Sequence, residues 1–357
     1  MSQPSAKKRI WGWFFFDWAS QPYNTLLLTF VFGPYFSAIV TQHLIGTGMA
    51  EEAAKAQAQS IWGFGLTIAG LIIAFSAPVL GAMADAAGRR MPWIWFFSVL
   101  YVIGSAAIWF TYPDASNYKL MLFMFCVGFV GMEFATLFTN SLLPDLGTKE
   151  EIGQISGSGF AFGYWGGFIA LVIMLLLFAE GDSGTTLAQI KPLFGLDPVA
   201  REGTRFVGPF SALWYIVFMA IFFRWVKEPK RHARGKVALG AAFSELGRTI
   251  RSLKHRTSLF AYLTSSLFYR DALNGLYTFG GIYALNVLDW SITQVGVFGI
   301  VGIVSAAVFA WVGGKADKAR GPKPVIVFSI FTLVVVTSVI IGMTREQIFG
   351  LPLAEGS

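Results

Sequence analysis

The segments GAMADAAGRRMPWI (81–94) and GGKADKARGPKPVI (313–326) repeat one pattern in two distant parts of the chain. The matched positions, taken in pairs, are Gly81 and Gly313, Asp85 and Asp317, Pro92 and Pro324, and Ile94 and Ile326. Each copy connects two long apolar stretches. Because parallel internal repeats of this kind build the two halves of one transporter architecture, the chain is predicted to contain two related helical bundles.

The composition predicts an all-α polytopic membrane protein. Of the 357 residues, 55% are hydrophobic and 13% are charged, whereas soluble domains carry about 25% charged residues. A helix needs roughly 20 apolar residues to cross a bilayer. Nine stretches reach that length: 11–40, 60–82, 92–112, 119–143, 154–178, 208–226, 259–286, 294–312 and 324–343. This pattern excludes a water-soluble enzyme, a disordered chain and a nucleic-acid-binding protein, and it makes the lipid bilayer the first partner.

The basic residues predict how the spans are oriented. Cytoplasmic segments of membrane proteins are enriched in Lys and Arg. When nine spans are drawn, most of the 27 Lys and Arg residues lie on the side that carries the N-terminus. The N-terminus is therefore expected in the cytoplasm, with the chain in a bacterial inner membrane. The net charge of +7 reflects this orientation and not binding to nucleic acid.

A polar connection is predicted to divide the chain. Residues 1–226 contain six spans that form an N-terminal bundle, and residues 258–357 contain three spans of an incomplete second bundle. Residues 227–257 form a cytoplasmic linker, in which apolar residues from Phe243 to Leu253 recur at helical spacing among basic ones. This pattern indicates a basic amphipathic helix on the inner membrane face. The alternative is a solvated linker that happens to be helical.

The first repeat, G-x-x-x-D-x-x-G-R-R between the second and third spans, resembles the signature loop of the major facilitator superfamily. The segments FFFDWASQPYNTLLLTFVFGPYF (14–36) and GQISGSGFAFGYWGG (153–167) resemble the vacuole-effluxer-like branch, which includes the autophagy-related vacuolar amino-acid effluxer and many bacterial permeases. The resemblance implies a two-bundle fold with twelve spans, of which nine are present. The chain is accordingly expected to be either a fragment or a genuinely shortened transporter.

The resemblance also implies a conformational latch, formed by Gly81, Asp85, Gly88, Arg89 and Arg90. In the superfamily the Asp of this loop pairs with a nearby Arg and with a helix N-terminus in the other half. Because the span that would receive this contact, the eleventh, is not among the nine, we expect Asp85 to pair locally with Arg89. The alternative is a solvated turn whose basic residues only set the orientation.

Polar and charged residues within the spans are the candidates for solute binding and ion coupling. Burying a charge in a membrane is costly unless the charge is paired or hydrated. Each charged residue of this kind shares a helix face with neutral polar residues three or four positions away. The resemblance places the three helices concerned around a central cavity. The candidate set is Asp17, Gln21, Asn24, Glu133, Asn140, Arg270, Asp271 and Asn274.

Glu133 and Arg270 are predicted to pair near the centre of the membrane. Counted from the cytoplasmic ends of their spans, both lie about 16 Å deep at about 1.5 Å per residue. A solute carboxylate that competes for Arg270 would free Glu133 to take up a proton. The alternatives are a purely structural ion pair and, for Asp17, a carboxylate that only reaches interfacial water.

Small residues in the fifth span predict close helix packing. Gly159, Gly163, Gly166 and Gly167 form a stripe that lets another helix approach closely. In a transporter the same stripe can act as a sliding surface, and tight packing alone is the alternative.

Enzyme chemistry has little support in the sequence. His43, His232 and His255 form no metal-ligand spacing, and no phosphate-binding G-x-x-x-x-G-K-[ST] motif occurs. Cys126 is the single cysteine, so an intrachain disulfide is excluded. No catalytic residue, cofactor or metal is therefore expected.

These observations predict a secondary transporter that works by alternating access. The resemblance makes small polar solutes the expected cargo, with amino acids as the leading class. Their movement is either coupled to an ion gradient, with protons as a candidate partner, or passive. Two other functions stay open: a non-transporting membrane sensor or scaffold built on a shortened transporter fold, and a lipid or drug exporter.

Overall fold

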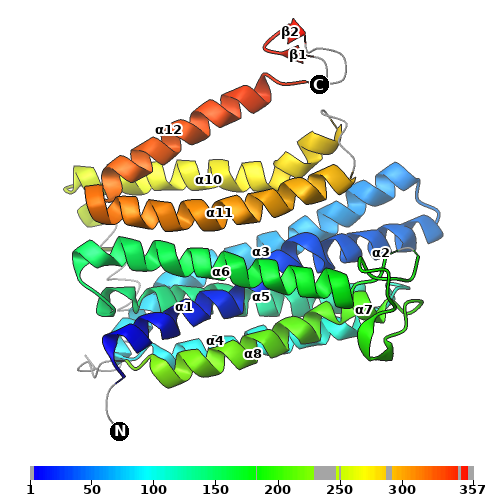
Figure 1. Ribbon diagram of the computed structural model, residues 1–357, viewed down its shortest axis with the longest axis horizontal. Helices are drawn as coiled ribbons and strands as arrows, with labels where there is room; N and C mark the ends of the chain where they lie inside the picture. Colours follow the sequence, from blue (N-terminus) through cyan, green and yellow to red (C-terminus); the bar gives the residue numbers. More distant parts are fainter. Residues whose placement is uncertain are drawn as a thin grey trace.

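The computed structural model describes residues 4–181, 183–228, 247–248, 251–286, 292–344 and 347–352, apart from the side chains of residues 86, 274, 275, 277–286, 292–297 and 352. Most of the described chain is helical, and the helices run roughly alongside one another (Figure 1). Within these ranges, eight helical segments are long and apolar enough to cross a membrane. The fold is therefore the all-α polytopic fold that the sequence predicts.

The first span changes its helix type in the middle. α1 (Ala6–Pro22) is an α-helix, η1 (Tyr23–Phe30) is a π-helix, and α2 (Phe32–Gly46) is again an α-helix. The change follows Pro22, which lacks the N–H group that a regular α-helix needs and whose ring crowds the preceding turn. π-Helical turns inside helices are frequent at functional sites, so η1 marks a part of the span to examine.

The other elements follow the predicted spans. They are α3 (Glu51–Ala87), α4 (Met91–Ala107), η2 (Ile108–Phe110), α5 (Tyr118–Asn140), η3 (Leu143–Asp145), α6 (Lys149–Leu177), η4 (Leu193–Gly195), α7 (Glu202–Arg205), α8 (Val207–Trp225), α10 (Thr257–Asn286), α11 (Ile292–Arg320), α12 (Pro322–Ile341), β1 (Gln347–Ile348) and β2 (Leu351–Pro352). α3 begins at Glu51 instead of residue 60, because the polar residues before the apolar stretch are good helix formers and Lys55 pairs with Glu51 at 2.8 Å. α10 lies at the predicted seventh span but is not among the eight apolar segments.

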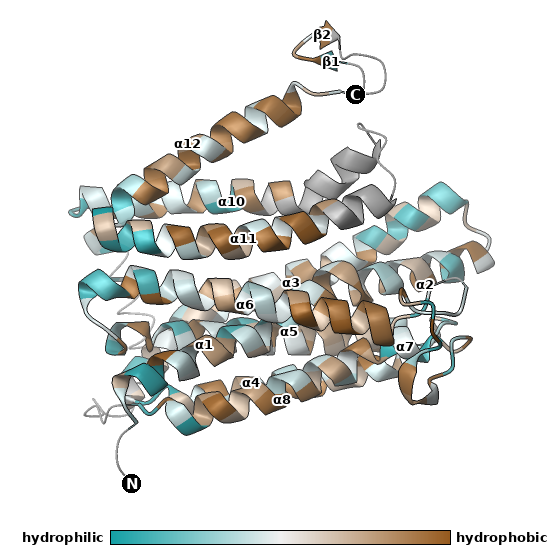
Figure 2. Ribbon diagram, in the orientation of Figure 1, coloured by the Kyte–Doolittle hydropathy of each residue, from teal (hydrophilic) through white to brown (hydrophobic). Residues whose placement is uncertain are grey.

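The bundle formed by α1 to α8 has an aromatic core. Trp13, Tyr23, Tyr101, Phe125 and Tyr215 are among its fully buried side chains. The rings of Tyr101 and Tyr215 stack with their centroids 3.9 Å apart. Many large apolar side chains of the bundle are also exposed, and Figure 2 shows that hydrophobic residues extend along most of its helices. A surface of this kind suits lipid rather than water.

α10, α11 and α12 lie together on one side of this bundle (Figure 1). α11 packs along α6, whereas α10 and α12 pack mainly against α11. No residue of α12 is buried. α6 and α11 approach closely because glycines face each other: a Cβ on Gly157 would lie 2.7 Å from the Cα atom of Gly314. Small residues at membrane helix contacts allow this approach.

The predicted linker falls mostly outside the described residues. Residues 229–246 and 249–250, which carry Phe243 and most of the predicted amphipathic helix, are not described. α8 ends at Trp225 and α10 begins at Thr257. The division of the chain into bundles at 1–226 and 258–357, with a linker at 227–257, stays a prediction.

Candidate functional site

The helix bundle has two ends, which we call the basic end and the loop end. The basic end carries the start of α1 with Arg9, the start of α4 with Arg90, and the end of α8. The loop end carries residues 178–206, between α6 and α8 (Figure 1). Both ends lie outside the apolar middle of the helices, where a solute would have to cross.

Polar side chains of α1, η1 and α5 are the candidates for a solute site, with Asn140 at the end of α5. Gln21, Asn24, Glu133 and Asn140 are each half-buried. The Asn24 Nδ2 atom lies 4.0 Å from the sulfur of Met132, the residue before Glu133. This contact places η1 beside α5, whereas Gln21 lies beside Gly167 of α6, where an added Cβ would come within 2.7 Å of the Gln21 Cγ atom.

Two hydroxyl groups hold η1 in place beside α5. The Tyr23 hydroxyl donates a hydrogen bond to the carbonyl oxygen of Phe125, with 2.5 Å between the oxygens. The Thr29 hydroxyl donates to the carbonyl oxygen of Asn24 at 2.8 Å. The π-helical turn that presents Asn24 is therefore fastened both to α5 and to itself.

The predicted pair of Glu133 and Arg270 is not formed. No ion pair among the described residues contains either of them. Arg270 and Asp271 are exposed on α10, which packs against α11 and not against α5. Equal depth along two helices does not decide which helices are neighbours, and this is why the prediction is wrong for this structure. The side chain of Asn274 lies outside the described residues.

Asp17 faces α6 and is buried. Its exposed fraction is 9%, and its Oδ2 atom has no hydrogen-bond partner. A Cβ on Gly159 would lie 2.9 Å from this oxygen, and a Cβ on Gly163 would lie 3.0 Å from the Asp17 Cβ. The expected alternative, a carboxylate that reaches interfacial water, does not describe this position.

The glycine stripe of α6 receives the side chains of α1. Gly159 faces Trp13 as well as Asp17, and the remaining contacts continue along the helix. A Cβ on Gly166 would lie 2.8 Å from the Trp18 ring, and one on Gly167 would lie 2.6 Å from the Thr25 hydroxyl. Every predicted packing glycine thus lies where a side chain of the first span needs the room.

The first repeat forms an ion pair that differs from the expected one. Asp85 pairs with Arg90 at 2.9 Å, while Arg89 is exposed. The reason is that Gly88 ends α3 in a left-handed conformation, with φ of 64°, which reverses the chain before Arg90. A Cβ on Gly81 would meet no atom within 4 Å, so this glycine has room for a side chain.

Two acidic residues from other segments complete the contacts of this loop. The Glu228 carboxylate accepts hydrogen bonds from the backbone N–H groups of Arg90 at 2.7 Å and Met91 at 3.1 Å, and therefore caps the N-terminus of α4. Arg90 also lies 3.8 Å from Asp145, whose carbonyl oxygen accepts a bond from Arg9 at 2.5 Å. The latch loop is thus tied to the segments of Glu228 and Asp145, and through Asp145 to Arg9 on α1.

A polar cluster at the loop end was not predicted. Glu180 is 6% exposed, and its Oε1 atom accepts a bond from the Thr204 hydroxyl at 2.9 Å. Burial raises the pKa of Glu180 above its ordinary value, while its hydrogen bonds and the charge of Arg201 oppose this shift. In the sequence these loop charges indicate only the orientation of the spans, and their spacing does not predict the contacts of Glu180.

Arg205 joins this cluster to the end of α4. Its Nε atom donates to the carbonyl oxygen of Trp109 at 2.8 Å. The guanidinium lies 5.0 Å from the centroid of the Trp109 ring and 4.8 Å from that of Tyr112, within the range of cation–π attraction. Arg205 is 4% exposed, so the two rings and the backbone oxygens take the place of water.

Among the residues that the structure describes, no group of three or more His, Cys, Asp or Glu residues is placed to hold a metal ion. The candidate site residues instead lie along the faces of helices. Long apolar helices, an internal repeat and half-buried polar faces together define a membrane transporter of the major facilitator type. A structural comparison agrees: the proton:xylose symporter XylE, solved with bound 6-bromo-6-deoxy-D-glucose, has a TM-score of 0.63 at 13% identity, over 89% of this chain and 70% of that chain.

The chain belongs to the vacuole effluxer Atg22-like family, which it matches over residues 5–352. It is also 22% identical over 324 residues to the uncharacterized MFS-type transporter YxiO of Bacillus subtilis (strain 168), covering 91% of this chain and 71% of that protein. These relatives are transporters and not enzymes. The predicted family, fold class and non-enzymatic function are therefore confirmed.

Proposed function

We propose that this transporter moves small polar solutes, with amino acids as the leading class, and that it couples their movement to protons. It would act in a bacterial inner membrane, with its N-terminus in the cytoplasm. The observation that carries the proposal is the pair of half-buried polar side chains that Asn24 on η1 and Glu133 on α5 place within the apolar spans. Gln21 lies beside Gly167 of α6, and Asn140 lies at the end of α5.

The chemistry of these polar side chains suits a zwitterionic solute. Side-chain amides of Gln and Asn both donate and accept hydrogen bonds, so they can bind a carboxylate and an ammonium group. Glu133 has no ion-pair partner among the described residues, and an unpaired carboxylate at this depth is expected to bind a cationic group or a proton.

Proton coupling follows from the same residue. When a solute ammonium group leaves Glu133, the carboxylate loses its only positive neighbour and gains affinity for a proton. The structurally similar XylE is a proton:xylose symporter, and this supports protons as the first coupling ion to test. Glu133 is therefore proposed to bind the proton, as the sequence predicts, but without Arg270 the solute and the proton compete for it instead of binding together.

The test is transport by the purified chain in proteoliposomes. Radiolabelled alanine, leucine, lysine and glutamate are offered with and without a pH gradient, and xylose is offered for comparison. We expect protein-dependent flux of at least one amino acid, and we expect a protonophore to abolish its accumulation. If none of the amino acids crosses in exchange or uptake, the proposal is wrong, and the sensor or exporter hypotheses follow.

A variant series then locates the solute site. Glu133→Gln should lower gradient-driven accumulation at least tenfold, because the carboxylate that exchanges a proton for the ammonium group is gone. The matched control is Glu52→Gln, whose side chain is 92% exposed at the start of α3. If Glu133→Gln keeps both flux and solute binding within twofold of wild type, the site lies elsewhere.

A further inference from the structure

Asp17 occupies a place that is separate from the candidate solute site. It lies between α1 and α6, in what we call the α1–α6 seam, formed by Trp13 and Asp17 on α1 and by Gly159 and Gly163 on α6. The side chain is nine-tenths buried, and its Oδ2 atom has no hydrogen-bond partner. Eleven residues separate it from the start of α1 at Ala6, or about 16 Å along the helix.

Charged groups on the neighbouring helices do not neutralise this carboxylate. Arg9 on α1 is bound to the carbonyl oxygen of Asp145. The other ionisable side chains on the packed elements, beyond the helix ends, are Tyr23 on η1, Glu133 on α5, Tyr164 on α6, and Tyr215 and Arg224 on α8. None of the ion pairs in the described part of the chain includes Asp17.

An ionised carboxylate is costly at such a buried position, because no ion pair among the described residues compensates its charge. A neutral carboxylic acid has no such cost. The two glycines matter here, because their missing Cβ atoms leave just enough room for the Asp17 side chain between the backbones. The closed seam therefore favours the protonated form of Asp17 over the ionised form.

We propose that Asp17 is a proton-binding residue, which holds its proton while the α1–α6 seam is closed and releases it to water when α1 and α6 separate. The O–H bond of the acid breaks, the proton passes to a water molecule that enters the seam, and the carboxylate that remains is hydrated. Protonation is thereby coupled to helix separation and not to direct contact with the solute. This inference rests on the proposed proton-coupled transport and adds a second titrating group to Glu133.

The first experiment needs no solute. Infrared spectra of the full chain in lipid vesicles are recorded from pH 5 to pH 9, to follow the C=O stretch of protonated carboxyl groups. We expect a band that Asp17→Asn removes and Glu133→Gln leaves in place. If the Asp17→Asn protein does not fold, wild type with ¹³C-labelled aspartate carboxyl groups should shift the same band. A spectrum without any aspartate-derived acid band across this range contradicts the proposal.

The second experiment measures coupling in proteoliposomes with the amino acids used above. Asp17→Asn should retain solute exchange within about threefold of wild type while losing at least tenfold in accumulation driven by a pH gradient. Glu52→Gln should change neither. If Asp17→Asn accumulates solute as wild type does, Asp17 is not the proton site and the proposed function stands. If wild type itself moves no amino acid, the proposed function fails, and the infrared result still decides whether Asp17 binds a proton.

Discussion

The carboxylate of Asp317 lies directly over Gly153, so that the second copy of the repeat, at the end of α11, touches the first turns of α6. One turn further along α6, Gly157 faces Gly314 and the carbonyl oxygen of Ala310, and a Cβ on Gly157 would lie 2.6 Å from that oxygen. Two helix backbones therefore meet without side chains between them. This contact joins α10–α12 to the rest of the molecule.

The first prediction concerns this contact. Gly157→Ala should push α11 away from α6 and lower the thermal midpoint of the purified protein, because overpacking a tight contact costs about 1–3 kcal/mol. The matched control is Gly70→Ala in α3, where an added Cβ meets no atom within 4 Å. Thermal unfolding in detergent measures both, and equal midpoints for the two variants would show that α6 and α11 do not pack as described.

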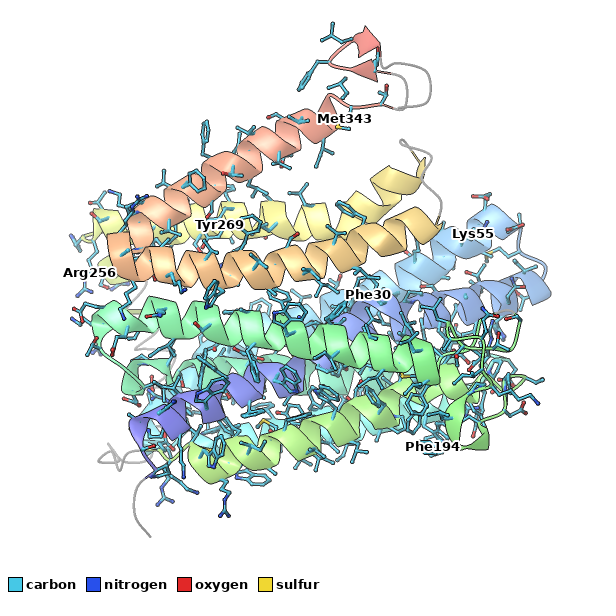
Figure 3. All side chains as sticks on the ribbon, viewed as in Figure 1. Phe30, Lys55, Phe194, Arg256, Tyr269 and Met343 are labelled. Carbon is cyan, nitrogen blue, oxygen red and sulfur yellow. The ribbon has the colours of Figure 1, made fainter. Side chains whose placement is uncertain are left out.

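The second prediction concerns Phe30, the last residue of η1, which is labelled in Figure 3 and whose ring faces α11. A Cβ on Gly299 would come within 2.9 Å of the Phe30 ring. Gly299→Ala should therefore slow solute exchange, and Phe30→Ala should relieve most of that effect in the double variant, because the two residues are in direct contact. Gly302→Ala, with no neighbour within 4 Å of its Cβ position, is the control. Additive effects of the two changes would exclude the contact.

The sequence predicts the arrangement along the chain better than the arrangement between helices. Apolar length predicts the eight described segments that can cross a membrane, whereas α10, at the predicted seventh span, is not among them. The glycine pattern of α6 predicts a packing face. The start of α3 was missed because hydropathy ignores polar residues that are good helix formers. The π-helix η1 was also missed, since nothing in its residues other than the preceding Pro22 signals a change of helix type.

The candidate site shows the same limit. Helical spacing decides which residues share a face, so Gln21 and Asn24 could be grouped from sequence. It does not decide which helix that face meets. The spacing groups Asp17 and Gln21 with Asn24, but Asp17 and Gln21 both pack against α6. It also pairs Arg270 with Glu133, although the helix of Arg270 contacts α11. Contacts between helices depend on neighbours that are distant in sequence.

The third prediction concerns orientation. Cys126 is the only cysteine, so Cys126→Ser provides a background for single-cysteine reporters. Leu187→Cys at the loop end, where Leu187 is 68% exposed, should react with a membrane-impermeant maleimide in intact cells. Lys7→Cys at the basic end should react only after the cells are opened, since basic segments favour the cytoplasm. The reverse pattern would place the N-terminus outside.

The fourth prediction concerns Glu180 and pH. Burial raises the folded-state pKa of this carboxyl group above its ordinary value of 4.5, so folding favours the protonated form. The contribution of Glu180 to the free energy of unfolding is fully present below pH 4.5. It is lost as the pH rises through the folded-state pKa. Glu180→Gln mimics the protonated group and keeps an oxygen that accepts the bond from Thr204. It should therefore remove this part of the pH dependence.

Thermal midpoints between pH 4.5 and pH 8 measure the effect of Glu180→Gln. The midpoints of the variant and wild type should converge as the pH falls towards 4.5 and below, because Glu180 is then increasingly protonated in both the folded and the unfolded chain. At pH 8 the variant should have the higher thermal midpoint, because it avoids the cost of burying the ionised carboxylate. Glu52→Gln is the control, since its exposed carboxylate should leave the two profiles parallel. A variant that loses stability at pH 8 would mean that the ionised carboxylate, through Thr204 and Arg201, holds the loop end together more strongly than its burial opposes it.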